Sequence, residues 1–193
     1  MAGWVPRKKM MVFVDGSNFI AQLIKERSLS CRADKPNPAY YQIAWEILWK
    51  IACLGPQPKE IIRAYWFGSY KGNDQDCLEY CKTLRASHFD PVLFRLHNSR
   101  EKGVDIALTK EMLVNAFHTN FEVGLLVAGD EDYVGLVKEV KRYGASIQGA
   151  FFESGLSPYL RLEFDEFYSM TGFWQEPLLG KTLSIIEDRL KGA

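Results

Sequence analysis

Two runs of apolar residues constrain the fold of this chain more than any other feature. The first covers residues 10–14 and the second covers residues 123–128, and in neither do apolar residues alternate with charged ones. Runs of strand length that are apolar throughout are typical of strands covered on both faces, as in parallel sheets that lie between helices. The two runs therefore predict a buried sheet that is mainly parallel.

Segments of strand length alternate with segments of helical periodicity almost to the end of the chain. This alternation predicts right-handed βαβ units in one open sheet. The expected fold class is α/β, a three-layer αβα sandwich around a central, mainly parallel sheet. The expected strands are 10–14, 60–67, 91–96, 123–128 and 145–152, and the expected helices are 18–27, 40–54, 74–87, 104–117 and 132–143.

Size and composition are those of an ordinary globular protein. The chain has 193 residues, of which 47% are hydrophobic and 25% are charged, and its 24 Lys and Arg balance its 24 Asp and Glu. We expect a single domain over residues 1–171, followed by an extension over 172–193 with a short amphipathic helix. That helix can pack on its own domain or on a partner, and a homodimer is one possible assembly. The four cysteines lack zinc-site spacing and no apolar run has membrane-spanning length, so we expect a reduced, cytoplasmic protein without a membrane partner.

Carboxylates follow both apolar runs. Asp15 comes directly after the first run, Asp130 and Asp132 come after the second, and Asp105 lies at the start of a predicted helix. Ligands of open parallel sheets bind outside the carboxyl ends of the strands, so these side chains are expected at a shared edge. Each Asp taken alone is also typical of a turn or a helix cap, and Ser17 is a candidate N-cap. Together, oxygen ligands without His or Cys indicate a site for Mg²⁺ or Mn²⁺.

Three segments carry a resemblance to a known family: VFVDGSNF, KGVDIALTKEML and LLVAGDEDYVGLVKEVKRYGASI. They resemble the NYN domain family, the LabA/DUF88 branch of the PIN-like, metal-dependent ribonuclease superfamily, over roughly residues 10–170. The resemblance implies a PIN-like αβα fold and hydrolysis of RNA that depends on Mg²⁺ or Mn²⁺. It places the family's catalytic positions on Asp15, Asn18, Asp105, Asp130 and Asp132, with the four aspartates as metal ligands.

The chain departs from the family pattern at three positions. Ala128 replaces the usual serine, Tyr133 replaces a phenylalanine, and Glu111 stands where relatives often carry Asp. The replacement at residue 133 is expected to be mild. Asp105 and Glu111 are six residues apart and do not share one helix face, so Glu111 is equally compatible with a surface role and a metal role.

Two loops are expected to contact RNA beside the carboxylates, namely residues 68–73 and 95–103. They combine cations, amide and hydroxyl donors and an aromatic ring, which suits phosphates and unpaired bases. Solvated surface loops have the same composition, so the assignment of any single residue stays open. The residues expected to bind RNA, single-stranded or structured, are Lys102, Arg100, Arg95, Tyr70 and Ser17.

The function predicted is a metal-dependent ribonuclease that needs no protein nucleophile, in which Asn18 orients a water or phosphate oxygen. A phosphatase of the haloacid dehalogenase type is disfavoured, because its second Asp would fall on Ser17. A non-catalytic module that binds RNA or protein and keeps the fold and the metal site is the alternative. The serine missing at Ala128 and the neutral net charge favour that alternative, whereas the complete set of carboxylates favours the enzyme.

Overall fold

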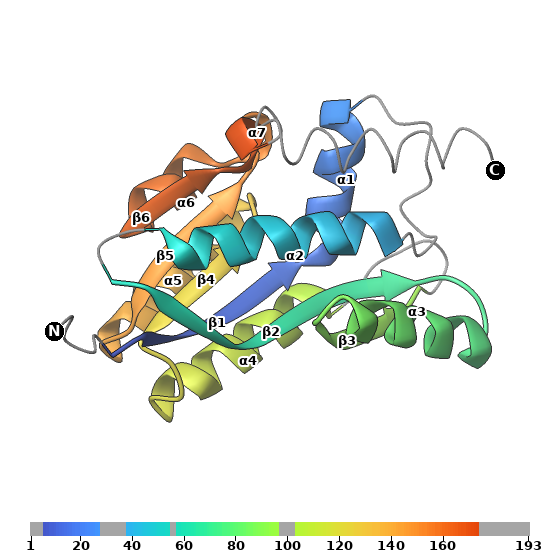
Figure 1. The fold of residues 1–193 in the computed structure, drawn as a ribbon, viewed down its shortest axis with the longest axis horizontal. Coiled ribbons are helices and arrows are strands. Elements are labelled where there is room, and N and C mark those ends of the chain that lie inside the picture. The colour runs from blue at the N-terminus through green and yellow to red at the C-terminus, as the bar shows by residue number, and fades with distance from the viewer. Residues whose placement is uncertain (1–5, 28–37, 55–56, 97–102, 174–193) are drawn as a thin grey trace, which may run out of the picture.

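The computed structural model describes residues 6–27, 38–54, 57–96 and 103–173 of the chain (Figure 1). Six strands form one sheet in the order β3-β2-β1-β4-β5-β6, and every neighbouring pair is parallel. The prediction of an α/β fold around a mainly parallel sheet is thus confirmed. The strands are β1 (Lys8–Asp15), β2 (Lys59–Tyr70), β3 (Asp90–Arg95), β4 (Val123–Val127), β5 (Ser146–Phe151) and β6 (Glu166–Ser169).

Helices cover both faces of the sheet and give the molecule three layers. One buried cluster joins the sheet to α1 (Gly16–Arg27), α2 (Pro38–Cys53), α3 (Asp74–Ala86) and α7 (Met170–Phe173). The other buried cluster joins it to α4 (Val104–Phe117), α5 (Val134–Arg142) and α6 (Pro158–Glu163). The short 3₁₀ turns η1 (Glu131–Tyr133) and η2 (Glu153–Gly155) follow β4 and β5.

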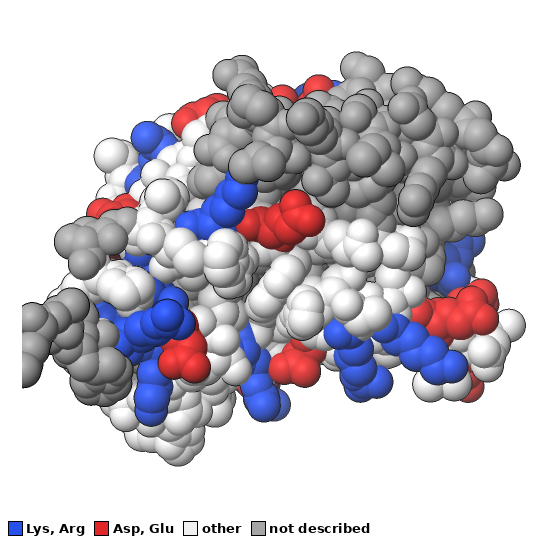
Figure 2. All heavy atoms as spheres, viewed as in Figure 1, with Lys and Arg blue, Asp and Glu red and all other residues white. Residues whose placement is uncertain are grey.

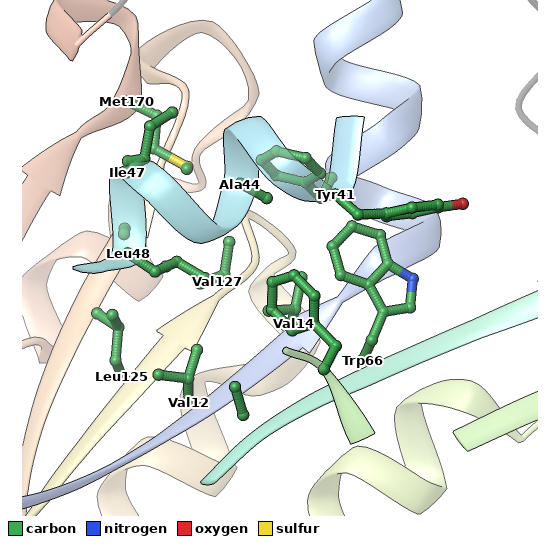
Figure 3. Close-up of a cluster of buried hydrophobic side chains, with 14 of the residues drawn as sticks. Val12, Val14, Tyr41, Ala44, Ile47, Leu48, Trp66, Leu125, Val127 and Met170 are labelled. Carbon is green, nitrogen blue, oxygen red and sulfur yellow. The ribbon is translucent and has the colours of Figure 1, made fainter. Parts of the chain in front are cut away.

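Helix α2 carries four aromatic residues, Tyr40, Tyr41, Trp45 and Trp49, and packs on the centre of the sheet. The apolar side chains on its inner face and those of the strands below are buried, as strands covered on both faces require. The outer side of the helix is exposed at Gln42, Glu46 and Trp49. Figure 3 shows the contact between α2 and strands β1, β2 and β4, formed by Tyr41, Ala44, Ile47, Leu48, Val12, Val14, Trp66, Leu125 and Val127.

The structure differs from the sequence prediction at several element ends. The segment 68–70, expected in a loop, continues β2. Strand β3 covers 90–95, in agreement with the predicted strand 91–96 to within one residue at each end. Helix α1 begins at Gly16, so Ser17 lies inside its first turn and is not its N-cap. The helix expected over 132–143 is divided into η1 and α5. Strand β6 and the short helices α6 and α7 were not predicted, because four to six residues are too few for a clear periodicity.

The direction of the chain reverses at the centre of the sheet. From β1 the chain proceeds outward to β2 and β3, and it then returns through α4 to β4, on the other side of β1. Helices α1, α2 and α3 on the outward path cover one face, and α4, α5 and α6 after the reversal cover the other, as right-handed crossovers require. The short helix α7 at the end of the described chain lies on the first face. A crevice at the carboxyl ends of β1 and β4 is the consequence.

The surface carries charges of both signs. On the face seen in Figure 2, Lys and Arg are interspersed with Asp and Glu, and the described residues of that face form no continuous basic surface. Within the part of the chain that the structure describes, no helix combines the length and the apolar character that crossing a membrane requires. The amphipathic extension expected over 172–193 lies almost entirely outside the described residues.

Gly129, in the turn after β4, offers a test of this packing. A Cβ atom there would lie 2.2 Å from the carbonyl oxygen of Gly155 and 2.5 Å from the ring of Phe151. We expect Gly129→Ala to lower the free energy of unfolding by about 1–3 kcal/mol, measured by urea denaturation, because the backbone around η2 must shift. Gly135→Ala is the control, since a Cβ at Gly135 meets nothing within 4 Å, and it should be neutral or stabilise by up to about 1 kcal/mol. Equal effects of the two variants would contradict the packing described.

Candidate active site

The central strands bring two of the predicted carboxylates to one edge of the sheet. Asp15 is the last residue of β1, and Asp130 follows the end of β4 by three residues. The two strands are direct neighbours, with Val14 in register with Val127. Asp15 and Asp130 therefore both lie at the crevice created by the reversal of the chain.

Helix α4 brings the third segment to the same edge. Gly103 precedes the helix in the left-handed region, with φ of 92°, a conformation that glycine adopts without strain. The inner face of α4, with Val104, Leu108 and Met112, belongs to the buried cluster that includes Phe13 of β1. Because α4 lies over the centre of the sheet, Asp105 in its first turn reaches the crevice.

A pocket of about 420 Å³ occupies this crevice. All four predicted aspartates line it, together with Ser17 and Asn18 of α1. Among the described residues of the lining, none is Lys, Arg or His, so the pocket is strongly negative. The complete lining is Asp15, Ser17, Asn18, Ala21, Val104, Asp105, Asp130, Asp132 and Tyr133.

Asp15 is the fixed member of this set. Only 9% of its surface is exposed, and both carboxylate oxygens accept hydrogen bonds. Oδ1 accepts the backbone N–H of Asn18 at 3.0 Å, and Oδ2 accepts the hydroxyl of Tyr133 at 2.8 Å. The first bond is the kind that an N-cap makes at the start of a helix, so the capping interpretation and the site interpretation both apply to Asp15.

The hydroxyl of Tyr133 stays protonated at neutral pH, because its pKa is raised. Burial raises the pKa of Tyr133 far above its usual value, and the neighbouring carboxylates of Asp15, Asp105 and Asp130 raise it further. The ring is 2% exposed, so the hydroxyl is a dependable donor to Asp15. The exchange of Phe for Tyr, expected to be mild, thus adds a hydrogen bond to the central carboxylate.

Asn18 joins α1 to the end of β4. Its Oδ1 accepts the backbone N–H of Gly129 at 3.0 Å. The side-chain oxygen is therefore engaged in holding the turn that carries Asp130. The role predicted for Asn18 remains chemically open: the amide nitrogen can donate to a phosphate oxygen, and Oδ1 has a second lone pair that can accept from a water.

Asp130 lies directly before the turn η1 and Asp132 lies within it, and both are exposed. Oδ1 of Asp130 accepts the backbone N–H of Asp132 at 3.2 Å, which makes Asp130 the cap of this turn. The sequence had suggested Asp132 as the capping residue. Asp132 instead occupies the middle of η1 and lines the pocket.

The donor set suits a hard cation, but its geometry is not that of a formed metal site. Carboxylate, amide and hydroxyl oxygens line the pocket, and these are the ligands that Mg²⁺ and Mn²⁺ prefer. Within the described residues, however, no three side chains of Asp, Glu, His or Cys are gathered closely enough to hold one ion. Because Asp105, Asp130 and Asp132 are exposed, their side chains have room to approach Asp15.

The other predicted residues lie away from this pocket or outside the described residues. Arg95 is 4.0 Å from Asp74 in an exposed ion pair, and Tyr70, its neighbour in register, is half-buried against the core. Oε1 of Glu111 accepts the side-chain amide of Asn115 at 3.0 Å. None of these three residues lines the pocket. Lys102 and Arg100 lie outside the described residues.

Comparison with known families matches this arrangement to one domain type. The model of the NYN domain matches residues 9–171, which include every residue of the pocket. The chain belongs to the NYN domain family. No curated protein matches this NYN domain. A crystal structure of a Vibrio parahaemolyticus protein of unknown function is similar, with a TM-score of 0.63, 20% identity, and coverage of 85% of this chain and 93% of the Vibrio chain.

The Vibrio structure supports the fold of the NYN domain and carries no information about its activity. The sequence indicated that Asp15 and Asp130 lie near each other, because both follow apolar strands, and the structure brings them to one pocket. Tyr133 was the residue whose importance sequence reasoning missed. The sequence did contain a signal. Tyr133 follows three acidic residues directly, and the helical periodicity places it on the buried side, where its hydroxyl needs a partner.

Removing the hydroxyl of Tyr133 tests the bond to Asp15. We expect Tyr133→Phe to lower the free energy of unfolding by about 1–3 kcal/mol at neutral pH, since a buried carboxylate loses a hydrogen bond. Chemical denaturation of the two proteins measures the difference. Tyr143→Phe is the matched control, because its ring is 40% exposed and contacts Phe117 edge-on, and it should change stability by less than about 0.5 kcal/mol. A loss no greater than that of the control would show that the bond contributes nothing.

Proposed function

We propose that the chain is a metal-dependent ribonuclease, with its activity in a domain over residues 1–171. The observation that carries the proposal is the convergence of four aspartates from three separate segments on one pocket in an NYN domain. Four carboxylates that line a pocket of about 420 Å³ repel one another, and they also repel any phosphate that enters. A divalent cation would reduce both sources of repulsion.

The proposed cofactor is Mg²⁺ or Mn²⁺, held by Asp15, Asp105, Asp130 and Asp132. The chemistry that such an ion supplies is a lower pKa for the attacking water and a counter-charge for the phosphate. Asp15 contributes a carboxylate that is already fixed by two hydrogen bonds. The other three aspartates contribute carboxylates that adjust to the ion. Because Asp15 is already in place, the free-energy cost of assembling the ligands is lower.

The remaining residues of the pocket position the substrate in this proposal. Ser17 lies in the first turn of α1 and lines the pocket, where its hydroxyl can donate to a phosphate oxygen. Asn18 holds the turn of Asp130 through Gly129 and keeps α1 and β4 together. Reaction with water requires no protein nucleophile, and Ser17 needs no base beside it.

A non-catalytic module that binds RNA or protein is the second candidate. It is favoured by the absence, within the described residues, of three ligands already gathered around one point. In that case the acidic pocket would be a remnant of the family's site. The two candidates differ in what a metal does: the enzyme needs it for cleavage, whereas the module binds RNA equally well without it.

Asp130→Asn separates the enzyme from the module. Because Asn keeps an oxygen that can cap η1, the variant should stay folded. We expect Mn²⁺-dependent cleavage of single-stranded and structured RNA by the wild type, and a loss of kcat of about 100-fold or more in the variant. Glu131→Gln is the control, since Glu131 is bonded to Ser157 at 3.3 Å and does not line the pocket. Cleavage that is equal in Asp130→Asn and wild type would exclude the proposed site.

Binding of Mn²⁺ gives a second test that does not depend on cleavage. Isothermal titration should show saturable binding of Mn²⁺ by the wild type, weakened at least about tenfold by Asp15→Asn or Asp105→Asn. Glu131→Gln should bind Mn²⁺ as the wild type does. RNA binding that persists in EDTA, with no cleavage even when Mn²⁺ is bound, would support the module instead.

A further inference from the structure

A second groove adjoins the carboxylate pocket, along the outer side of α4. It has a volume of about 480 Å³, which is in the range of sites for small organic groups. Helix α4 forms one side and the turn η1 the other. The lining is Asp105, Ile106, Thr109, Lys110, Leu113, Val114, Asp132 and Tyr133.

Helix α4 is apolar on its outer side as well as on its inner side. Leu108 and Met112 are fully buried on the inner side, as a helix packed on a sheet requires. On the outer side, Ile106 is 69% exposed and Val114 is 45% exposed. A helix on the surface of a domain normally presents polar residues there, so apolar residues that line a groove indicate a ligand.

The groove and the carboxylate pocket adjoin and share part of their lining. Asp105, Asp132 and Tyr133 line both, and the two carboxylates therefore stand at the boundary between an acidic cavity and an apolar one. A linear ligand with its phosphate at the carboxylates must place its next group on one side or the other of this boundary. The groove is the apolar space available to that group.

Resting on the proposed ribonuclease function, we infer that this groove holds one unpaired base of the RNA strand beside the bond that is cut. Ile106, Leu113 and Val114 offer apolar surface to the faces of a base. The hydroxyl of Thr109 can bond the base edge, and the exposed ammonium of Lys110 complements the charge of the following phosphate. A stable dimer buries about 800 Å² on each partner, far more than this groove provides.

The experiment compares two single-stranded oligonucleotides that differ by one base. Once the cleavage position is mapped, the nucleotide flanking it is replaced by an abasic ribose. Wild-type full chain with Mn²⁺ should show a KM about tenfold lower for the intact strand than for the abasic strand. The double variant Ile106→Ser/Val114→Ser should reduce that ratio to nearly one, by raising the KM for the intact strand. Leu78→Ser, a residue of α3 that is 54% exposed, is the control and should keep the ratio.

The measurements distinguish failure of the base site from failure of the ribonuclease function. If the double variant keeps the tenfold ratio while the wild type cleaves RNA, the base site is wrong and the ribonuclease function stands. If the wild type cleaves neither strand, both proposals fall together. Sedimentation that shows a dimer of the wild type, lost in the double variant, would assign the groove to a second copy of the chain and overturn the base site.

Discussion

The parallel pairing of β1 with β4 is the constraint on which the rest of the structure depends. These strands are buried on both faces, and they are neighbours although more than a hundred residues separate them in the chain. Their pairing reverses the direction of the chain, so that α1 leaves on one face of the sheet and α4 returns on the other. The space between the first turns of these two helices is the pocket. Any change that moved β4 from β1 would separate Asp15 from Asp130.

The burial of Asp15 shows how folding and the site depend on the same bonds. A carboxylate that is 9% exposed is unfavourable in the folded state unless hydrogen bonds replace its water. The N–H of Asn18 and the hydroxyl of Tyr133 supply those bonds from opposite faces of the sheet. The bonds that make the charge tolerable also fix its position. Asp105, Asp130 and Asp132 remain exposed and need no such support, so their positions are adaptable.

Strands and helices with a clear pattern along the chain could be predicted from the sequence. Contacts between residues far apart in the chain could not. The apolar runs predicted β1 and β4 and placed Asp15 and Asp130 at one edge, because parallel strands share a direction. The contact between Tyr133 and Asp15 joins residues 118 positions apart, and no local pattern encodes it. The extension of β2 to Tyr70 was missed because Gly68 and Ser69 read as a turn, although pairing with β3 holds them in the sheet. The proposal of a metal site rests on the residue types in the sequence, whereas the spacing of the ligands depends on side-chain geometry, which the sequence does not encode.

The electrostatic character of the pocket constrains how the proposed RNA substrate would approach it. The chain has no net charge, the face in Figure 2 shows no continuous basic surface among the described residues, and the described lining of the pocket is acidic. Long-range attraction of a polyanion therefore cannot come from these surfaces. Short-range contacts would then supply the affinity, and the two proposed for the described residues are a cation between the carboxylates and an apolar groove beside them. Occupation of the proposed groove requires an unpaired base, and contact with the proposed cation requires a phosphate. In this proposal a single-stranded segment satisfies the pocket and the groove together, whereas a duplex keeps its bases paired.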